Sequence, residues 1–233
     1  MKKDTCILLF SRSVEEESKV KSFGRTFTRN QNAQIAQNLI AHTLSIVKST
    51  EVPYVYFSEM HQLGGNFGER LSNAVKRAIN AGYKRVLIVG NDCPTLTHYD
   101  LLHSISLLKK GQTVVGPTHN GGAYIIGLQS ASFDEKAFCN LRWNTTFCFD
   151  SLLKHYADED VCILPEQNDL NVLTAYMSRL SIDMKIRIGW LLKVTFLGQV
   201  RSEWLLDKVQ TLIPHFSAKS RRGPPRLSHR WAG

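Results

Sequence analysis

The sequence predicts an α/β protein in which helices cover both faces of a mostly parallel central sheet. First, apolar runs of strand length alternate with segments of helical periodicity up to about residue 180. Second, the run Val-Leu-Ile-Val at 86–89 is uniformly apolar, which is typical of a strand buried on both faces in the middle of a parallel sheet. Third, the repeated order of strand, helix and strand predicts right-handed parallel crossovers.

Composition indicates an ordinary soluble protein. Of its 233 residues, 43% are hydrophobic and 21% are charged, and no stretch approaches the roughly 18–20 apolar residues of a membrane span. The first apolar run, 6–10, is shorter than the roughly 7–15 residue core of a secretory signal. The five cysteines are scattered and include no C-x-x-C pair, which favours reduced, buried thiols. We therefore expect a cytoplasmic location.

The net charge of +9 is concentrated at the C-terminal end. Residues 182–233 carry ten Lys or Arg against three Asp or Glu, so they hold +7 of the total and the rest of the chain is nearly neutral. We expect one domain over 1–180, an amphipathic extension over 181–216 and a basic, disordered tail over 217–233. Because the charge belongs to the tail, nucleic acid is not an expected partner. Oligomeric state is not readable from the sequence.

The first half of the chain divides into clear segments. The predicted strands are 6–12, 52–58 and the central run ending at 89, and a polar loop spans 13–29. A helix over 30–48 has apolar residues at the i, i+3, i+4 spacing. A glycine-rich turn at 62–71 runs into a second helix, which Gly82 ends.

The second half continues the alternation. Thr97 is a candidate N-cap for a helix over 97–110. Short strands at 112–117 and 123–128 flank a turn with two glycines, and Arg142-Trp-Asn-Thr-Thr146 leads into another helix. A strand at 161–165 and a helix at 169–180 complete the predicted domain.

Asp92 is the first candidate functional residue. It lies just past the carboxyl end of the central strand, where open α/β sheets bind ligands. A carboxylate there could hold a metal ion or a hydroxyl group, and the alternative is a turn-forming Asp. Arg12, at the end of the first strand, and Lys19 and Lys21, after it, should reach the same edge, where they could neutralise a diphosphate or remain solvated surface cations.

The glycine-rich segment 62–70 is a second candidate. Gly64, Gly65 and Gly68 offer backbone N–H groups near a helix start, and Arg70 lies on the first turn, an arrangement that suits a phosphate. An ordinary loop is the alternative, because the spacing matches neither G-x-G-x-x-G nor a P-loop. No histidine pair has ligand spacing and no G-x-S-x-G elbow occurs, so we predict neither a histidine metal site nor a hydrolase triad.

Taken together, these segments resemble a specific family. The strand C-I-L-L-F, then Q-L-G-G-N-F-G-E-R-L, V-G-N-D-C-P, G-P-T-H-N-G-G-A-Y-I-I-G-L and R-W-N-T-T are similar to bacterial GT-A-like proteins classed as glycosyltransferases, some of them linked to arsenosugar biosynthesis. The resemblance covers about 6–180. It implies a Rossmann-like three-layer sandwich of the nucleotide-diphospho-sugar transferase superfamily, which also contains molybdenum-cofactor and phospholactate nucleotidyltransferases.

The resemblance also implies roles for individual residues. Asp92 would bind Mg²⁺ or Mn²⁺, Asp169 would make a second metal contact, and Asp92 and Lys21 would be catalytic. The implied partners are a nucleotide-sugar donor and a small-molecule acceptor. The nucleotide- and substrate-binding set implied by the motifs consists of Arg12, Gly65, Gly68, Arg70, Asn91, Asn120, Gly121, Gly122, Trp143 and Thr145.

Two departures from the family pattern keep alternatives open. The first loop reads V-E-E-E-S-K-V-K-S-F, with no glycine, three glutamates and Phe23 where the family has arginine. Asn120 replaces the aspartate of D-G-G-Y, and an amide is a weaker metal ligand. The leading hypothesis is a metal-dependent glycosyltransferase. The alternatives are a nucleotidyltransferase acting on a phosphorylated small molecule and a non-catalytic nucleotide-binding homologue.

Overall fold

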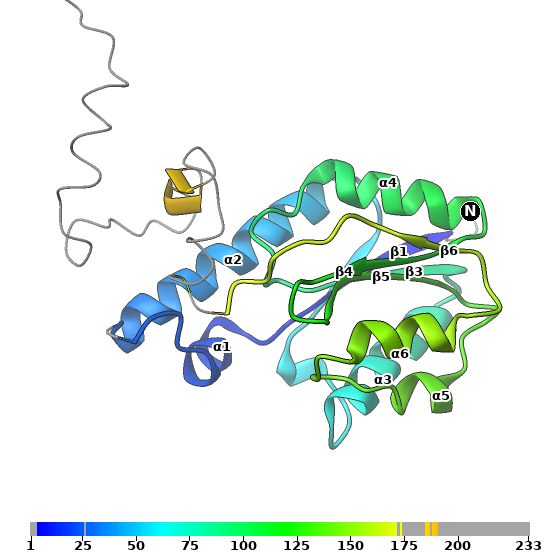
Figure 1. Ribbon diagram of the computed structural model, residues 1–233, viewed down its shortest axis with the longest axis horizontal. Coiled ribbons are helices and arrows are strands. Elements are labelled where there is room, and N and C mark those ends of the chain that lie inside the picture. The colour runs from blue at the N-terminus through cyan, green and yellow to red at the C-terminus, as the bar shows by residue number, and fades with distance from the viewer. Residues whose placement is uncertain (1–3, 26, 172, 174–184, 187, 191–233) are drawn as a thin grey trace, which may run out of the picture. The chain divides into compact units, whose positions relative to one another are not determined.

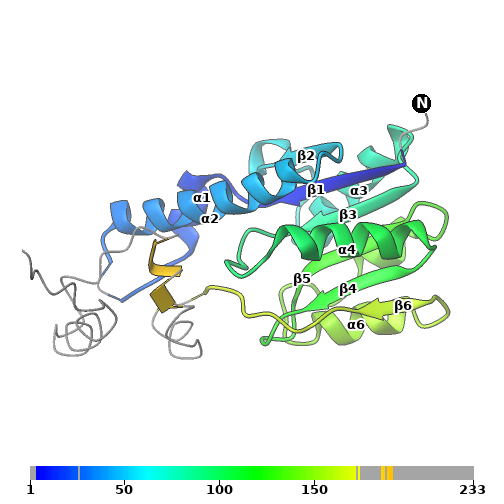
Figure 2. The same cartoon turned by 90° about the horizontal axis from the view of Figure 1, so that it is seen from above.

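A computed structural model describes residues 4–25, 27–171, 173, 185–186 and 188–190. In this part of the chain, six strands form one sheet (Figure 1), in the order β2-β1-β3-β5-β4-β6 that can be followed in Figure 2. Except at 185–186 and 188–190, the predicted extension at 181–216 and the whole predicted tail at 217–233 lie outside the described residues. The strands are β1 (Thr5–Phe10), β2 (Tyr54–Phe57), β3 (Arg85–Val89), β4 (Thr113–Pro117), β5 (Ala123–Gln129) and β6 (Val161–Ile163).

The sheet is mostly parallel, as predicted. Strand β1 pairs in parallel with β2 and β3, and β4 pairs in parallel with β6. Strand β5 alone runs antiparallel to both of its neighbours, β3 and β4. The short turn 118–122 explains this reversal, because so few residues can connect adjacent strands only as a hairpin.

Helices cover both faces of the sheet, which confirms the three-layer sandwich. Helices α2 and α4 lie on one face, and α3, α5 and α6 lie on the other (Figures 1 and 2). Alternate residues of β3 divide between the two cores: Val86 and Ile88 face the α3 side, while Leu87 and Val89 face the α4 side. The helical elements are α1 (Val14–Val20), α2 (Arg29–Ser49), the 3₁₀ turn η1 (Glu59–His61), α3 (Phe67–Asn80), α4 (His98–Lys109), α5 (Glu135–Cys139) and α6 (Cys148–His155).

The strand order contains a topological switch point between β1 and β3. From β1 the chain passes through α2 to β2 on one side, then returns through α3 to β3 on the other side. The carboxyl ends of β1 and β3 are adjacent, since Leu9 pairs with Val89 in register. In open α/β sheets this crevice is where ligands bind. The residues that follow these two strands are therefore the first to consider as a site.

Local signals account for most element boundaries. Thr97 is the N-cap of α4, as the sequence predicted. It forms a reciprocal capping box with Asp100, and Thr28 and Gln31 form the same kind of box at α2. None of the described helices combines the length and the apolar character needed to cross a bilayer.

Two sequence-based assignments need correction, and one helix was not predicted. The predicted polar loop 13–29 contains helix α1, because Ser13 accepts a hydrogen bond from Glu16 N–H and three glutamates occupy the first turn, where the helix dipole favours negative charge. Helix α5 was not predicted. The helix expected at 169–180 does not begin at Asp169, because 169–171 are not helical, and most of its remainder lies outside the described residues.

Candidate functional site

Lys21 and Asp92 meet at the switch point. Lys21 is the C-cap of α1, and Asp92 lies in the turn after β3. The Lys21 Nζ is 2.6 Å from Asp92 Oδ1. The lysine side chain is 15% exposed and the aspartate side chain is 37% exposed, so the pair lies at the edge of solvent. The expectation that these two residues share one edge of the sheet is therefore correct.

Glu17 holds the other side of Lys21. The Lys21 Nζ is 3.0 Å from Glu17 Oε1, and Arg12 Nη1 is 3.2 Å from Glu17 Oε2. The glutamate is only 2% exposed, so both of its oxygens are neutralised by cations within the protein. Glu17 therefore anchors the two basic residues rather than repelling a phosphate. The other two glutamates of α1, Glu15 and Glu16, pair with Lys19 on the exposed side.

The two carboxylates keep Lys21 charged. Burial by itself would lower the pKa of Lys21, but the negative charges of Asp92 and Glu17 outweigh it and raise the pKa above its usual value. The ammonium is therefore protonated at neutral pH. A charged donor fixed at two points is well suited to bind an anionic group.

Polar contacts between β1 and β2 position the loop that carries Arg12. Glu59 accepts hydrogen bonds from the backbone N–H and the hydroxyl of Ser13, the N-cap of α1. The Gln62 amide donates to the carbonyls of Ser11, at 2.8 Å, and Phe57, at 3.0 Å. Neither Glu59 nor Gln62 was predicted as a positioning residue, because only the parallel pairing of β1 and β2 brings them to this loop.

A segment near the C-terminal end of the domain crosses the same sheet edge. Gln167 bonds through its backbone to Pro117 and His119, each at 3.0 Å, and its side chain accepts from the Thr95 hydroxyl at 2.6 Å. The Leu170 N–H then donates to the Asp92 carbonyl at 2.7 Å. The segment 167–170 thus connects the tip of the β4–β5 hairpin to the turn that carries Asp92.

The neighbouring Asp169 is held by two amides. Its Oδ1 accepts from Asn120 Nδ2 at 2.7 Å and its Oδ2 accepts from Asn171 Nδ2 at 3.1 Å. The structure therefore brings Asn120 and Asp169 together, as two predicted site residues. In this arrangement the amide of Asn120 donates a hydrogen bond to the Asp169 carboxylate. An ionised aspartate at position 120, as in the family pattern, could only accept hydrogen bonds.

The contacts at this edge do not fit a preformed Mg²⁺ or Mn²⁺ site. Asp92 Oδ1 is in contact with an ammonium, and both oxygens of Asp169 accept amide N–H groups. Over the described ranges, no group of three His, Cys, Asp or Glu side chains is arranged to hold a metal ion. Hard divalent cations bind oxygen ligands, and three of the four carboxylate oxygens of Asp92 and Asp169 are already in contact with donors of the chain itself.

Gly68 and Trp143 have a packing role. A Cβ on Gly68 would lie 2.1 Å from the Cys139 carbonyl oxygen and 2.7 Å from Trp143 Cδ1. The Trp143 indole donates to the Phe138 carbonyl at 2.9 Å, and its ring lies 5.0 Å from that of Phe138 and 5.6 Å from that of Phe67. This glycine allows α3 to approach α5 closely, and the tryptophan fills the junction. Whether either residue also contacts a nucleotide stays a prediction.

Gly121 fixes the hairpin tip against the start of α6. Its φ is +78°, and a Cβ there would lie 2.0 Å from the Thr146 carbonyl oxygen. Its own carbonyl accepts from Phe149 N–H at 2.8 Å. Gly122 N–H donates to the Thr118 hydroxyl, and Thr145 donates its hydroxyl to a carbonyl within its own turn. All of these contacts shape the turn.

Two of the three remaining predicted residues retain unused donors. Gly65 is the exception: it is exposed, and its N–H donates to Glu69 Oε2 at 2.7 Å. Arg70 Nε and Asn91 Nδ2 are buried nitrogen atoms without a hydrogen-bond partner. Such orphaned donors are rare in folded proteins. Asn91 adjoins Asp92 directly, so at least one of these donors belongs to the turn of the candidate site.

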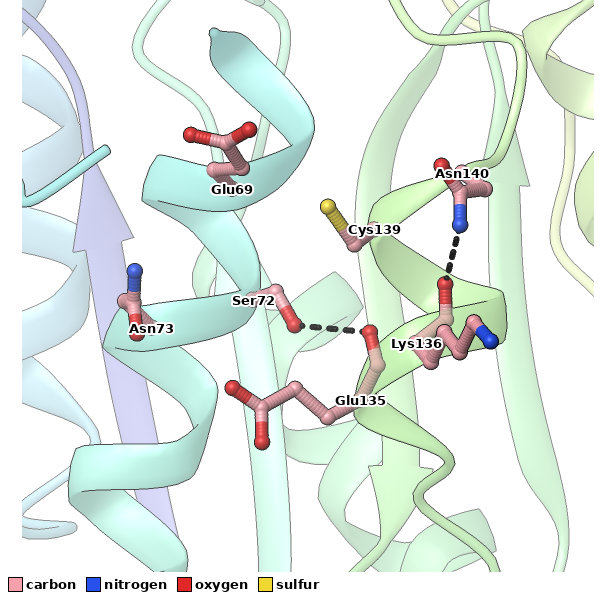
Figure 3. Close-up of a pocket in the computed structure, with 7 residues that line it drawn as sticks. All are labelled: Glu69, Ser72, Asn73, Glu135, Lys136, Cys139 and Asn140. Carbon is pink, nitrogen blue, oxygen red and sulfur yellow. Dashed lines mark hydrogen bonds between the residues drawn. The ribbon is translucent and has the colours of Figure 1, made fainter. Parts of the chain in front are cut away.

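A cavity elsewhere in the domain shares none of the predicted residues. It lies between α3 and α5 and has a volume of about 310 Å³ (Figure 3). Its polar walls largely bond to one another, as Ser72 donates to the Glu135 carbonyl and Asn140 donates to the Lys136 carbonyl. The lining residues are Glu69, Ser72, Asn73, Glu135, Lys136, Cys139 and Asn140.

Comparison with known proteins identifies the fold. Residues 33–145 match a family described as uncharacterized protein conserved in bacteria (DUF2064). A proposed nucleotide-diphospho-sugar transferase from Desulfovibrio desulfuricans G20 superimposes with a TM-score of 0.66 at 21% identity, covering 83% of this chain and 98% of that one. No functionally curated protein matches significantly.

Two further crystal structures are more distant. Rv0371c from Mycobacterium tuberculosis H37Rv in complex with manganese has a TM-score of 0.40 at 11% identity, covering 83% of this chain and all of that one. The 4-diphosphocytidyl-2C-methyl-D-erythritol synthase from Anaerococcus prevotii DSM 20548 has a TM-score of 0.43 at 12% identity, covering 82% and 97%. The chain therefore has the GT-A-like fold of nucleotide-diphospho-sugar transferases, and its residues 33–145 are similar to the bacterial DUF2064 family.

Proposed function

We propose that this protein is a glycosyltransferase that takes a nucleotide-sugar donor and transfers the sugar to a small-molecule acceptor. The observation that carries the proposal is the fixed Lys21 ammonium beside Asp92 at the switch point of the sheet. The diphosphate is the part of such a donor that a cation at this edge of the sheet would bind. The fold of the Desulfovibrio relative supports the same class of substrate.

Each residue of the pair has a separate task in this reaction. The Lys21 ammonium binds diphosphate oxygens and stabilises the negative charge that develops on the leaving nucleoside diphosphate. Arg12, whose side chain is 42% exposed, has guanidinium N–H groups beyond the one that contacts Glu17 and adds positive charge. Asp92 holds Lys21 through Oδ1 and, being partly exposed, can accept a hydrogen bond from an acceptor hydroxyl.

The family resemblance implies Mg²⁺ or Mn²⁺ at Asp92 and Asp169. Since three of the four carboxylate oxygens of these two residues are in contact with donors of the chain, the proposed reaction uses only groups of the chain. An alternative function, nucleotidyl transfer to a phosphorylated small molecule, would use the same cationic edge with a nucleoside triphosphate. A third possibility is a homologue that binds nucleotides without turnover.

One experiment separates these functions. The full-length protein is incubated either with UDP- or GDP-sugars and a mixture of small acceptors, or with nucleoside triphosphates and sugar phosphates. A glycosyltransferase releases nucleoside diphosphate from the first set, and a nucleotidyltransferase releases pyrophosphate from the second. Binding by calorimetry without either product identifies a non-catalytic homologue. Absence of both binding and turnover across both sets would contradict the proposal.

A further inference from the structure

We propose that Lys21, clamped between Glu17 and Asp92, takes the place of a divalent metal ion in this site, so that the protein binds nucleoside diphosphates without metal. The inference rests on the proposed function and specifies which cation binds the diphosphate of the donor. It follows from the way in which the charged groups at the carboxyl ends of β1 and β3 are already paired.

Asp92 is already in close contact with a cation. Its Oδ1 is 2.6 Å from the Lys21 ammonium, which makes the two groups a close ion pair. A metal ion bound to the same carboxylate would place two further positive charges next to that ammonium. The electrostatic repulsion between them opposes metal binding for as long as Lys21 stays in place.

Glu17 fixes the position of Lys21. Glu17 is 2% exposed and contacts both Lys21 and Arg12. If Lys21 moved away, it would leave a buried carboxylate with one cation fewer, which is costly. Glu17 therefore opposes the displacement of the ammonium from Asp92, and it keeps the charge in one place before any ligand arrives.

Asp169, the second carboxylate at this edge, is held by neutral donors. It accepts from the amides of Asn120 and Asn171 with both of its oxygens. An aspartate at position 120 would instead add a second negative group beside Asp169, which would favour a divalent cation. With Asn120, Asp169 has one acidic neighbour fewer with which to share such an ion.

Isothermal titration of the full-length protein with UDP, GDP, CDP and ADP tests the inference. Each titration is run in excess EDTA and again with Mg²⁺ or Mn²⁺. We expect the dissociation constant of the bound nucleotide to differ by less than about threefold between these conditions, well under the tenfold that corresponds to about 1.4 kcal/mol. A tenfold or larger gain in affinity with metal would overturn the inference and leave the proposed function intact. If none of the four nucleotides binds in any condition, both fall.

Substitutions locate the effect at the ammonium. Lys21→Met should weaken metal-free binding by tenfold or more, as expected for loss of a charged hydrogen bond. Lys21→Arg should retain most of the affinity. Lys19→Met is the matched control, because Lys19 is on the same helix, pairs only with exposed glutamates and should bind like the wild type. Wild-type affinity in Lys21→Met would refute the inference.

A double variant protects the test against misfolding. Lys21→Met alone leaves the buried Glu17 with Arg12 as its one remaining cationic partner. Lys21→Met/Glu17→Gln removes both charges of that pair and should restore folding, as judged by circular dichroism and thermal melting. The double variant should still lose metal-free nucleotide binding. If it folds and binds as tightly as the wild type, Lys21 is not the cation of the site.

Discussion

Glu17 lies in the last turn of α1 and Lys21 is the C-cap of that helix, and their charged atoms lie 3.0 Å from each other with the carboxylate buried. This pair links a structural feature, the buried acid, to the proposed ligand-binding cation. We expect Lys21→Met to lower the free energy of unfolding by about 3 kcal/mol, because removing one partner leaves an undercompensated buried charge. Urea denaturation measures the change, and the double variant with Glu17→Gln should recover part of it. Equal stability of the single variant and the wild type would contradict the pairing.

The hairpin tip provides a second prediction. Gly121→Ala forces a Cβ against the Thr146 carbonyl at a positive φ, so we expect a loss of about 3–5 kcal/mol of stability. Gly82→Ala is the matched control, since Gly82 has a φ of +92° but nothing within 4 Å of the Cβ position. It should lose only about 1–2 kcal/mol, the cost of the backbone conformation alone. Equal losses in the two variants would show that the contact with Thr146 is not as described.

Two glycines of the glycine-rich segment 62–70 allow its packing role and its binding role to be tested separately. Gly68→Ala should destabilise the protein by about 2–4 kcal/mol, because its Cβ would lie 2.1 Å from the Cys139 carbonyl oxygen. Gly65→Ala meets only a flexible Glu69 oxygen at 3.5 Å and should leave thermal stability nearly unchanged. If Gly65 lines the nucleotide pocket, as its motif predicts, this stable variant should bind nucleotide more weakly. Unfolding curves and calorimetry on both variants are the measurements, and a well-tolerated Gly68→Ala would refute the packing role.

Cysteine reactivity tests the packing of both faces of the sheet. Burial raises the pKa of Cys93 and of Cys148 to about 11. At pH 8 only about one molecule in a thousand carries either thiolate, so iodoacetamide should modify these two slowly in the native protein. Cys139 and Cys162 are only partly buried and should react first. Peptide mass spectrometry over a pH series should show Cys93 and Cys148 gaining reactivity only toward pH 11, and rapid labelling of both at pH 8 would contradict their burial.

The family arginine replaced by Phe23 offers a further test. Phe23 is fully buried, its N–H donates to Asn32 Oδ1 at 2.9 Å, and its carbonyl accepts from Leu173 N–H at 2.7 Å. The side chain is thus part of the core at the α1–α2 connection. Phe23→Arg should therefore lower stability by about 3 kcal/mol or more, through lost packing and a buried charge, without improving nucleotide binding. Tighter nucleotide binding by a stable Phe23→Arg variant would show that the position still faces the ligand.

Much of the fold was predictable because local patterns decide it. The apolar run of β3, the periodic face of α3 and the N-cap Thr97 each identify their element without long-range information. The sequence predicted that Lys21 and Asp92 lie at one edge of the sheet, since both follow strands that parallel crossovers bring to that edge. The contact between them comes from the structure.

The remainder depends on contacts between distant segments. Glu17 looks like one of three equivalent glutamates in the sequence, and only the fold shows that it alone faces Lys21 and Arg12. Gly68 belongs to a glycine-rich motif, and its neighbour Cys139 lies far along the chain, so its packing role could not be seen beforehand.

Hydrogen exchange with and without a bound nucleoside diphosphate tests the central claim most directly. The claim is that the ligand binds at the carboxyl ends of β1 and β3, around Lys21 and Asp92. The result predicted is slower exchange on ligand binding in peptides that cover 11–22 and 90–96. Protection confined to the α3–α5 cavity, in peptides that cover 69–73 and 135–140, would contradict the account.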